Sequence, residues 1–405
     1  MIKIYDTMTR SLRDFVPLTE NVVNMYVCGP TVYNYIHIGN ARSAVAFDTI
    51  RRYFEYCGYT VNYISNFTDV DDKIIKAANE AGISTKELSD KFIAAFMEDT
   101  GQLGIKPATQ NPRVINYMDE IIAFVSTLVD KGFAYVSEGD VYFRVAKSNN
   151  YAKLANKTLE DLEIGASGRT DAETERKENP LDFALWKAAK EGEVSWNSPW
   201  GPGRPGWHIE CSVMATEILG DTIDIHGGGA DLEFPHHTNE IAQSEAKTGK
   251  TFANYWMHNG FVNVDNEKMS KSLGNFVTVH DMLQTVDGQV LRFFLATQQY
   301  RKPINFTEKA IHDAEVNLKY LKNTHSLPLT EQVNQAELQT YLDAFQEAMD
   351  DDFNTANGVT VLFDMAKWIN SGNYDQTVKN AFEKMLQVFG IVFEEEVLDE
   401  DIEKL

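Results

Sequence analysis

The sequence predicts an α/β fold with a parallel sheet, interrupted by an insertion and followed by helices. Apolar segments over 21–28 and 60–67 flank a segment of helical spacing over 39–56. A strand, a helix and a strand in this order form a βαβ unit, in which the two strands run parallel. A different pattern begins at about residue 306, after which the chain has the apolar spacing of helices.

The helix expected over 39–56 has one apolar face, and Gly58 ends it. The face consists of apolar residues three and four positions apart: Ala44, Phe47, Ile50, Phe54 and Cys57. We therefore expect Cys57 to lie in the core. Ligands bind at the carboxyl ends of parallel strands, so a pocket is expected around Cys28-Gly29 and around 67–69.

After about residue 111 the pattern becomes that of an insertion. A helix is predicted over 117–131 and a hairpin over 133–145. The sheet pattern resumes over 207–214 and 223–225, which predicts two further strands. The insertion therefore divides the sheet-forming sequence into two parts.

Composition limits the possible classes of protein. The 405 residues with 43% hydrophobic content are enough for two or three domains. No apolar run approaches the length of a membrane helix, and the first residues lack the apolar centre of a signal peptide. The three cysteines are few and widely spaced, which indicates reduced thiols. A cytoplasmic protein without a membrane partner is expected.

The net charge of −23 disfavours nucleic acid as a partner unless cations gather locally. Three candidate groups are Arg51-Arg52, Arg301-Lys302 and the pair Lys319/Lys322. The alternative for each group is the solvated face of an ordinary helix.

Two short segments indicate a nucleotide site. Residues 36–40 (IHIGN) open a helix directly after an apolar strand, so backbone N–H groups and the His37 imidazole would face a triphosphate. Residues 268–272 (KMSKS) place the ammonium groups of Lys268 and Lys271 in one loop, which suits a departing pyrophosphate. Either segment alone also fits an ordinary turn or a solvated surface loop.

A second group of residues has the chemistry of a metal site: Cys28, Cys211, His236 and Glu240. A helix entry is predicted over 231–235, which places His236 and Glu240 on one helical face. Both cysteines lie at predicted strand ends, and two thiolates with an imidazole and a carboxylate suit Zn²⁺. His237 is an alternative ligand to His236. Two buried thiols beside a surface His/Glu pair remain the alternative to a metal site.

The chain resembles the cysteinyl-tRNA synthetases, which are class I aminoacyl-tRNA synthetases. The resemblance rests on segments that occur in the same order over essentially the whole chain: 25–33 (MYVCGPTVY), 37–40 (HIGN), 67–73 (FTDVDDK), 203–211 (GRPGWHIEC), 224–229 (DIHGGG), 234–237 (FPHH) and 268–272 (KMSKS).

The resemblance implies a domain organisation. A Rossmann catalytic domain would comprise residues 1–118 and 201–250, separated by a connective insertion at 119–200. A segment that contacts the tRNA stem and carries the KMSKS loop would follow at 251–306, and a helical bundle that contacts tRNA at 307–405. The implied substrates are ATP with Mg²⁺, L-cysteine and tRNA(Cys), and a monomer is expected.

The resemblance also implies site residues. One zinc ion per chain would be held by Cys28, Cys211, His236 and Glu240, and would select a thiolate over the hydroxyl of serine. The residues implied for binding cysteine are Gly29, Thr68, Trp207 and His226. Those implied for binding ATP are His37, Gly39, Asn40, Lys268 and Lys271, of which all but Gly39 are also implied in catalysis.

The sequence departs from the family pattern in two places. Asn40 replaces a frequent histidine in the HIGN segment. The sequence stops at Leu405, where family members continue into an anticodon-recognising domain, so a truncated chain is expected. Two rival functions are an ATP-dependent cysteine ligase acting on an amino sugar and a non-catalytic tRNA-binding paralogue.

Overall fold

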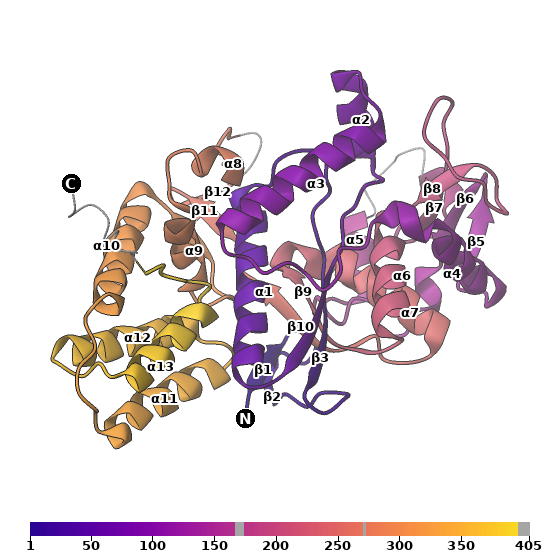
Figure 1. Ribbon diagram of the computed structural model, residues 1–405. Helices are drawn as coiled ribbons and strands as arrows, with labels where there is room; N and C mark the ends of the chain where they lie inside the picture. Colours follow the sequence, from indigo (N-terminus) through magenta and orange to yellow (C-terminus); the bar gives the residue numbers. More distant parts are fainter. Residues whose placement is uncertain (167–173, 270–272, 396–405) are drawn as a thin grey trace.

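The computed structural model describes residues 1–166, 174–269 and 273–395, and its centre is a four-stranded parallel sheet (Figure 1). The strands follow the order β10-β9-β3-β4, with the bounds Ala253–Asn259, Ile223–Gly229, Val22–Val27 and Thr60–Ser65. Strands β3 and β4 pair in parallel, as the sequence predicts. The α/β fold class is confirmed.

Helix α1 (Ile38–Tyr56) connects β3 to β4, which confirms the predicted helix. Its residues Phe47, Ile50 and Phe54 are buried against the sheet and the neighbouring helices. The prediction for Cys57 is wrong, because this residue follows the last helical turn and its side chain is exposed. Apolar spacing places a residue on a face of the helix, and that face is no longer covered at the helix end.

The strand predicted over 207–214 is also wrong, because these residues begin helix α6 (Trp207–Leu219). Every residue from Ile209 to Ala215 is buried, so the helix has no exposed stripe that would reveal its period. Cys211 therefore projects from a helix and not from a strand end. The strand that precedes it is β8 (Gly203–Pro205).

Helix α4 (Met118–Asp130) precedes an antiparallel sheet of β5 (Ala134–Ser137), β6 (Asp140–Phe143), β7 (Phe183–Ala188) and β8. This arrangement confirms the helix and the hairpin predicted after residue 111. The remaining α-helices and strands described before residue 300 are β1 (Lys3–Asp6), β2 (Ser11–Asp14), α2 (Asp72–Ala81), α3 (Thr85–Gln102), α5 (Leu159–Ala166), α7 (Thr238–Thr248), β11 (Val262–Val264), β12 (Glu267–Lys268), α8 (Val279–Met282) and α9 (Gly288–Ala296).

After β13 (Ile304–Phe306) the described chain is helical, as predicted: α10 (Glu308–His325), α11 (Gln335–Asp350), α12 (Thr355–Asn370) and α13 (Gln376–Val388). These helices lie beside α1 on one side of the sheet (Figure 1). The α1 residue Tyr53 contacts the ring of Phe345 and donates its hydroxyl hydrogen to Asp350 Oδ1 at 2.5 Å. Helix α1 and the C-terminal helices thus share one core.

A buried ion pair fastens α9 to α1. Arg292 Nη1 lies 2.6 Å from Asp48 Oδ2, and Arg292 Nε donates to the carbonyl oxygen of Phe389 at 2.9 Å. Both side chains of the pair are almost completely removed from solvent. A Cβ at Gly390, where φ is +75°, would lie 2.3 Å from Arg292 Cζ, so this turn accommodates the guanidinium by lacking a side chain.

The basic group Arg51-Arg52 does not form a solvated patch. Arg51 pairs with Glu55 at 3.1 Å, and Arg52 pairs with Asp48 at 2.8 Å, with both arginine side chains largely buried. Arg301 pairs with Asp352 at 2.6 Å. Among the helices in the described parts of the chain, none combines the length and the apolar character needed to cross a bilayer.

Candidate active site and metal centre

A cavity of about 740 Å³ lies at the carboxyl ends of β3 and β9. The predicted site residues among its lining are Cys28, Gly29, His37, Gly39, Asn40, Trp207 and Lys268. The structure therefore brings the HIGN segment, one cysteine of the metal group and the start of the KMSKS segment to a single cavity. Lys271 lies outside the described residues.

His37 forms the N-terminal cap of α1. Its Nδ1 accepts a hydrogen bond from the Asn40 N–H at 3.3 Å, and Asn40 Oδ1 accepts one from the His37 N–H at 3.2 Å. Burial, and then the positive charge of Lys73, lower the pKa of His37 to about 4. The ring is therefore neutral at pH 7, and because Nδ1 accepts, the ring proton is on Nε2. Nε2–H is left as a donor.

Gly39 gives the His37 ring its place. A Cβ at this position would lie 2.9 Å from His37 Cε1 and 3.0 Å from His37 Nδ1. A side chain here would therefore displace the imidazole from the end of α1. A glycine is therefore required at position 39 by a contact within the protein, in addition to any close approach of a nucleotide.

Backbone hydrogen bonds join this end of α1 to the segment that follows residue 272. The Ile38 N–H donates to the Val277 carbonyl oxygen at 2.9 Å, and the Val279 N–H donates to the Ile36 carbonyl oxygen at 3.0 Å. Before residue 270, Lys268 ends the short strand β12. Its side chain is exposed at the cavity.

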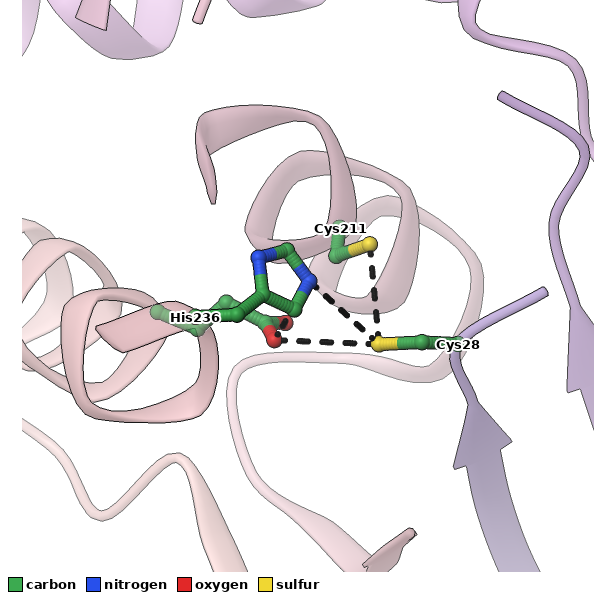
Figure 2. A group of neighbouring side chains, drawn as sticks. Cys28, Cys211 and His236 are labelled. Atoms are coloured by element: carbon green, nitrogen blue, oxygen red, sulfur yellow. Dashed lines mark hydrogen bonds and ion pairs between the residues drawn. The ribbon is translucent and has the colours of Figure 1, made fainter. Parts of the chain in front are cut away.

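The four predicted metal ligands meet beside the cavity (Figure 2). Cys28 Sγ lies 3.8 Å from Cys211 Sγ, 3.5 Å from His236 Nε2 and 3.8 Å from Glu240 Oε2. His236 Nε2 lies 3.3 Å from Glu240 Oε2. Cys28 follows β3, Cys211 lies on α6 and Glu240 lies on α7. His236 lies in the turn just before α7, and extended backbone at Phe234 interrupts the helix entry predicted over 231–235.

These distances fit a tetrahedral ion. Bonds of about 2.3 Å to sulfur and about 2.0–2.1 Å to nitrogen or oxygen give tetrahedral edges of about 3.8 Å between sulfurs, about 3.5 Å from sulfur to nitrogen or oxygen, and about 3.3 Å from nitrogen to oxygen. The four edges given above agree with these values to within about 0.3 Å. The donor set of two thiols, an imidazole and a carboxylate is one that Zn²⁺ accepts.

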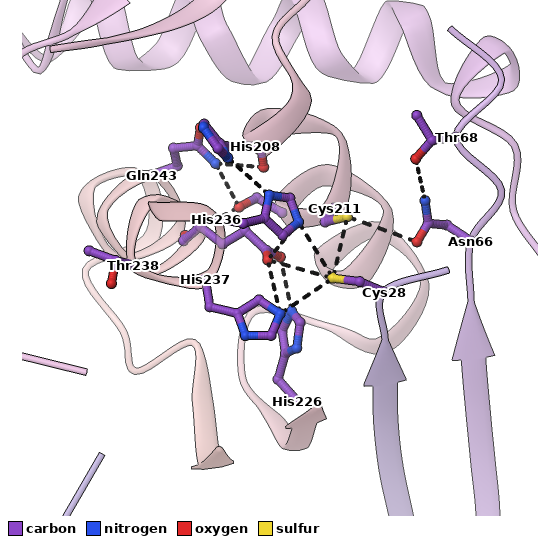
Figure 3. A network of polar contacts seen from close by, with 12 residues as sticks. Cys28, Asn66, Thr68, His208, Cys211, His226, His236, His237, Thr238 and Gln243 are labelled. Atoms are coloured by element: carbon purple, nitrogen blue, oxygen red, sulfur yellow. Dashed lines mark hydrogen bonds and ion pairs between the residues drawn. The ribbon is translucent and has the colours of Figure 1, made fainter. Parts of the chain in front are cut away.

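A second possible ligand group combines Cys28 and Glu240 with His226 and His237 (Figure 3). His226 Nε2 lies 2.9 Å from Glu240 Oε1, which is the length of a hydrogen bond and shorter than a tetrahedral edge. His226 therefore suits orientation of Glu240. His237 Nε2 lies 3.8 Å from Glu240 Oε2, against 3.3 Å for His236, so His236 fits the ligand position better.

The electrostatics of this cluster favour neutral groups as long as no cation is bound. Burial raises the pKa of the Cys28 thiol well above its ordinary value, and Cys211 and Glu240 add to the increase. Burial also raises the pKa of Glu240 and lowers that of His236 well below its ordinary value. A divalent cation would offset the cost of the two thiolates and the carboxylate, because its charge stabilises deprotonated ligands.

The residues predicted to bind cysteine fall into two groups. Gly29 and Trp207 line the cavity, and the Trp207 ring stacks on His236 with the centroids 3.9 Å apart. Thr68 and His226 are buried and do not line it. Thr68 accepts a hydrogen bond from Asn66 Nδ2 at 3.1 Å, and His226 contacts Glu240. Thr68 and His226 therefore support the site from outside the cavity.

Sequence reasoning missed two polar residues around the cluster. Asn66 Oδ1 accepts from the Gly29 N–H at 3.0 Å and lies 3.9 Å from Cys211 Sγ. His208 Nδ1 lies 2.9 Å from His236 Nδ1. The available signals were an asparagine at the predicted end of β4 and a histidine three residues before Cys211.

Comparison with known proteins identifies the class. Residues 14–316 match the family model "tRNA synthetases class I (C) catalytic domain", and residues 344–394 match the DALR domain. A solved methionyl-tRNA synthetase from Mycobacterium tuberculosis, in complex with methionyl-adenylate, has a similar fold. Its TM-score is 0.66 at 16% identity, over 91% of this chain and 89% of that chain. A leucyl enzyme, agnB2 LeuRS of Agrobacterium radiobacter K84, gives a TM-score of 0.66 at 10% identity, over 93% and 84% of the two chains.

Curated relatives narrow the class to one enzyme family. A cysteine--tRNA ligase of Streptococcus thermophilus (strain CNRZ 1066) is 95% identical over 405 residues, which are 100% of this chain and 91% of the relative. A cysteine--tRNA ligase of Streptococcus pyogenes serotype M6 is 84% identical over the same shares. The chain belongs to the cysteine--tRNA ligase family of class I aminoacyl-tRNA synthetases.

Proposed function

We propose that this chain activates L-cysteine with ATP to give cysteinyl-adenylate and transfers the cysteinyl group to the 3′ adenosine of tRNA(Cys). The observation that carries the proposal is the position of the four-residue metal cluster, which opens through Cys28 and Trp207 into the cavity that His37 and Lys268 also line. The residues that would select a thiol and those that would bind phosphate thus meet at one cavity.

One Zn²⁺ per chain would be held by Cys28, Cys211, His236 and Glu240. A bound zinc ion would supply a soft Lewis acid that favours a substrate thiolate over the hydroxyl of serine. The protein orients its own ligands: His226 contacts Glu240, and Trp207 and His208 fix the His236 ring. Residues that contact metal ligands commonly fix the orientation of a ligating imidazole ring in this way.

ATP, with its Mg²⁺, would lie over the N-terminal end of α1. The neutral His37 ring would donate from Nε2 to a phosphate oxygen, and the backbone N–H groups of α1 would add their partial positive charge. Lys268 and Lys271 would stabilise the charge on the leaving pyrophosphate. The cysteine carboxylate attacks the α-phosphorus in line, so positioning and charge stabilisation supply the catalysis and no general base is needed.

The further predictions form part of the same proposal. We assign the catalytic domain to 1–118 and 201–250, the insertion to 119–200, the stem-contact segment to 251–306 and the tRNA-contacting bundle to 307–405. A monomer in the cytoplasm remains a prediction. Asn40, predicted as a catalytic residue, would act by holding His37, since its side chain caps the helix.

The test of the proposal measures cysteine-dependent exchange of pyrophosphate into ATP, followed by charging of tRNA(Cys) and of an amino-sugar acceptor. Exchange with cysteine and not with serine, together with charging of tRNA(Cys), is the expected result. Acylation of the amino sugar in place of tRNA would favour the rival ligase. Absence of exchange with fully folded, zinc-loaded protein would favour the non-catalytic paralogue.

A further inference from the structure

The cavity has a charge opposite to that of the whole chain. Its lining includes the lysines Lys73, Lys106 and Lys268, and Asp231 is the one carboxylate among the described lining residues. The chain itself carries a net charge of −23. A local excess of cations in an acidic protein is the arrangement that an anionic ligand requires.

The three lysines differ in their partners. Lys106 forms an ion pair with Glu55, so its charge is already balanced. Within the described residues, neither the Lys73 nor the Lys268 ammonium group has an ion-pair partner; each lies near an aromatic ring, Tyr33 at 5.5 Å and Phe261 at 5.4 Å. These two exposed lysines are therefore available to a bound anion.

Helix stability does not explain a lysine at position 73. Asp71 caps α2 by accepting the Lys73 N–H at 2.8 Å, and Asp72 occupies the first turn. Lys73 follows in the same turn, where the helix dipole disfavours a cation. Asp72 does not neutralise it, because that carboxylate pairs with Arg204.

Lys73 also acts on His37, which lines the same cavity. Its positive charge contributes to the lowered pKa of His37, second to burial. Both side chains line the same cavity. Elements α2 and β12, which carry Lys73 and Lys268, both lie toward the end of the sheet where α1 begins (Figure 1).

We infer that Lys73 binds the β- and γ-phosphates of ATP together with Lys268, and so is a further catalytic residue of this site. The inference rests on the proposed function, because it presumes that the cavity holds ATP. The exposed position of Lys73 suits the pyrophosphate end of the nucleotide, which must leave to solvent. The adenosine end would lie deeper in the cavity.

The test compares Lys73→Gln with Lys76→Gln. Lys76 lies one turn further along α2, pairs with Glu80 at 4.0 Å and does not line the cavity. Calorimetry on the zinc-loaded full chain measures binding of ATP and of AMP, which lacks the β- and γ-phosphates. Lys73→Gln should weaken ATP binding by about tenfold or more and raise the KM for ATP in exchange, while AMP binding changes by less than about twofold.

Lys73→Arg should recover most of the ATP affinity, because it keeps the charge, and Lys76→Gln should resemble the unchanged chain. ATP affinity unchanged in Lys73→Gln would overturn the inference, and so would an equal loss of ATP and AMP binding. The proposed function is judged separately, by whether the unchanged chain carries out cysteine-dependent exchange at all.

Discussion

The Ile38 N–H donates to the carbonyl oxygen of Val277 at 2.9 Å, so main-chain atoms hold together the first turn of α1 and the segment that follows residue 272. The bond from Val279 to Ile36 repeats the connection in the opposite direction. No side chain is needed for this link. Substitutions of His37 or Lys268 should therefore change the chemistry of the cavity and leave the two segments in place.

The first prediction concerns the metal ligands. Cys211→Ser is expected to lower the zinc content of the purified chain from about one ion, because a hydroxyl is a poor ligand for Zn²⁺. Cysteine-over-serine selectivity in pyrophosphate exchange should fall with it. Zinc is measured by atomic emission and selectivity by the ratio of kcat/KM values.

Cys57→Ser is the matched control, since this cysteine is exposed at the end of α1 and belongs to neither possible ligand group. It should retain zinc and selectivity. Full zinc occupancy and unchanged selectivity in Cys211→Ser would remove Cys211 from the ligand set.

The second prediction uses the contact between Gly39 and His37. Gly39→Ala places a Cβ 2.9 Å from His37 Cε1 and should displace the ring, lowering exchange activity by a factor on the order of 10²–10³ while the fold is kept. A double-mutant cycle with His37→Ala identifies the cause. Once the imidazole is absent, adding Gly39→Ala should have little further effect. Fully additive losses would mean that Gly39 acts through direct approach of the nucleotide and not through His37.

The third prediction concerns Lys268. Lys268→Ala should lower cysteine-dependent exchange by a factor on the order of 10²–10³, the scale for losing one contact to the transition state. Zinc content should not change, because Lys268 lies outside the ligand cluster. Lys309→Ala, an exposed lysine on α10 that does not line the cavity, serves as the control. A loss of less than about threefold for Lys268→Ala would exclude a role in the transition state.

The fourth prediction concerns the buried pair of Arg292 and Asp48. Arg292→Met should lower the free energy of unfolding by about 3 kcal/mol, because Asp48 would remain buried with Arg52 as its one charged partner. Lys86→Ala removes an exposed ion pair with Asp90 and should change the free energy of unfolding by less than about 1 kcal/mol. Denaturant unfolding measures both. Equal small effects would show that the buried pair contributes no more than a surface pair.

The same pair predicts a dependence on pH. Burial raises the pKa of Asp48, but Arg292 and Arg52 outweigh it and hold the pKa below its ordinary value. The unfolded carboxyl then takes up a proton at a higher pH than the folded one. The stabilisation is complete above about pH 4 and is lost as the pH falls further. Arg292→Met should therefore flatten the fall in stability below pH 4.

Parts of this architecture could be predicted because their signals are local. The apolar period of α1 and the four-residue separation of His236 and Glu240 can each be read from one short continuous segment of the sequence. Helix α6 was mistaken for a strand because burial on all sides removes the period, and Cys211 was misplaced with it. Asn66 and His208 were missed because they reach their partners, Gly29 and His236, through long-range packing that no spacing rule describes.

Helix α1 begins at the cap of His37 in the cavity and, near its other end, bonds through Tyr53 to Asp350 of the C-terminal helices. Its 19 residues span about 28 Å, and removing one of them would shorten the helix by about 1.5 Å and turn one end against the other by about 100°. The length of α1 therefore fixes both the distance and the relative rotation between the cavity and the C-terminal helices. A single insertion or deletion within α1 would change both, whereas the loops around it can gain or lose residues without altering either.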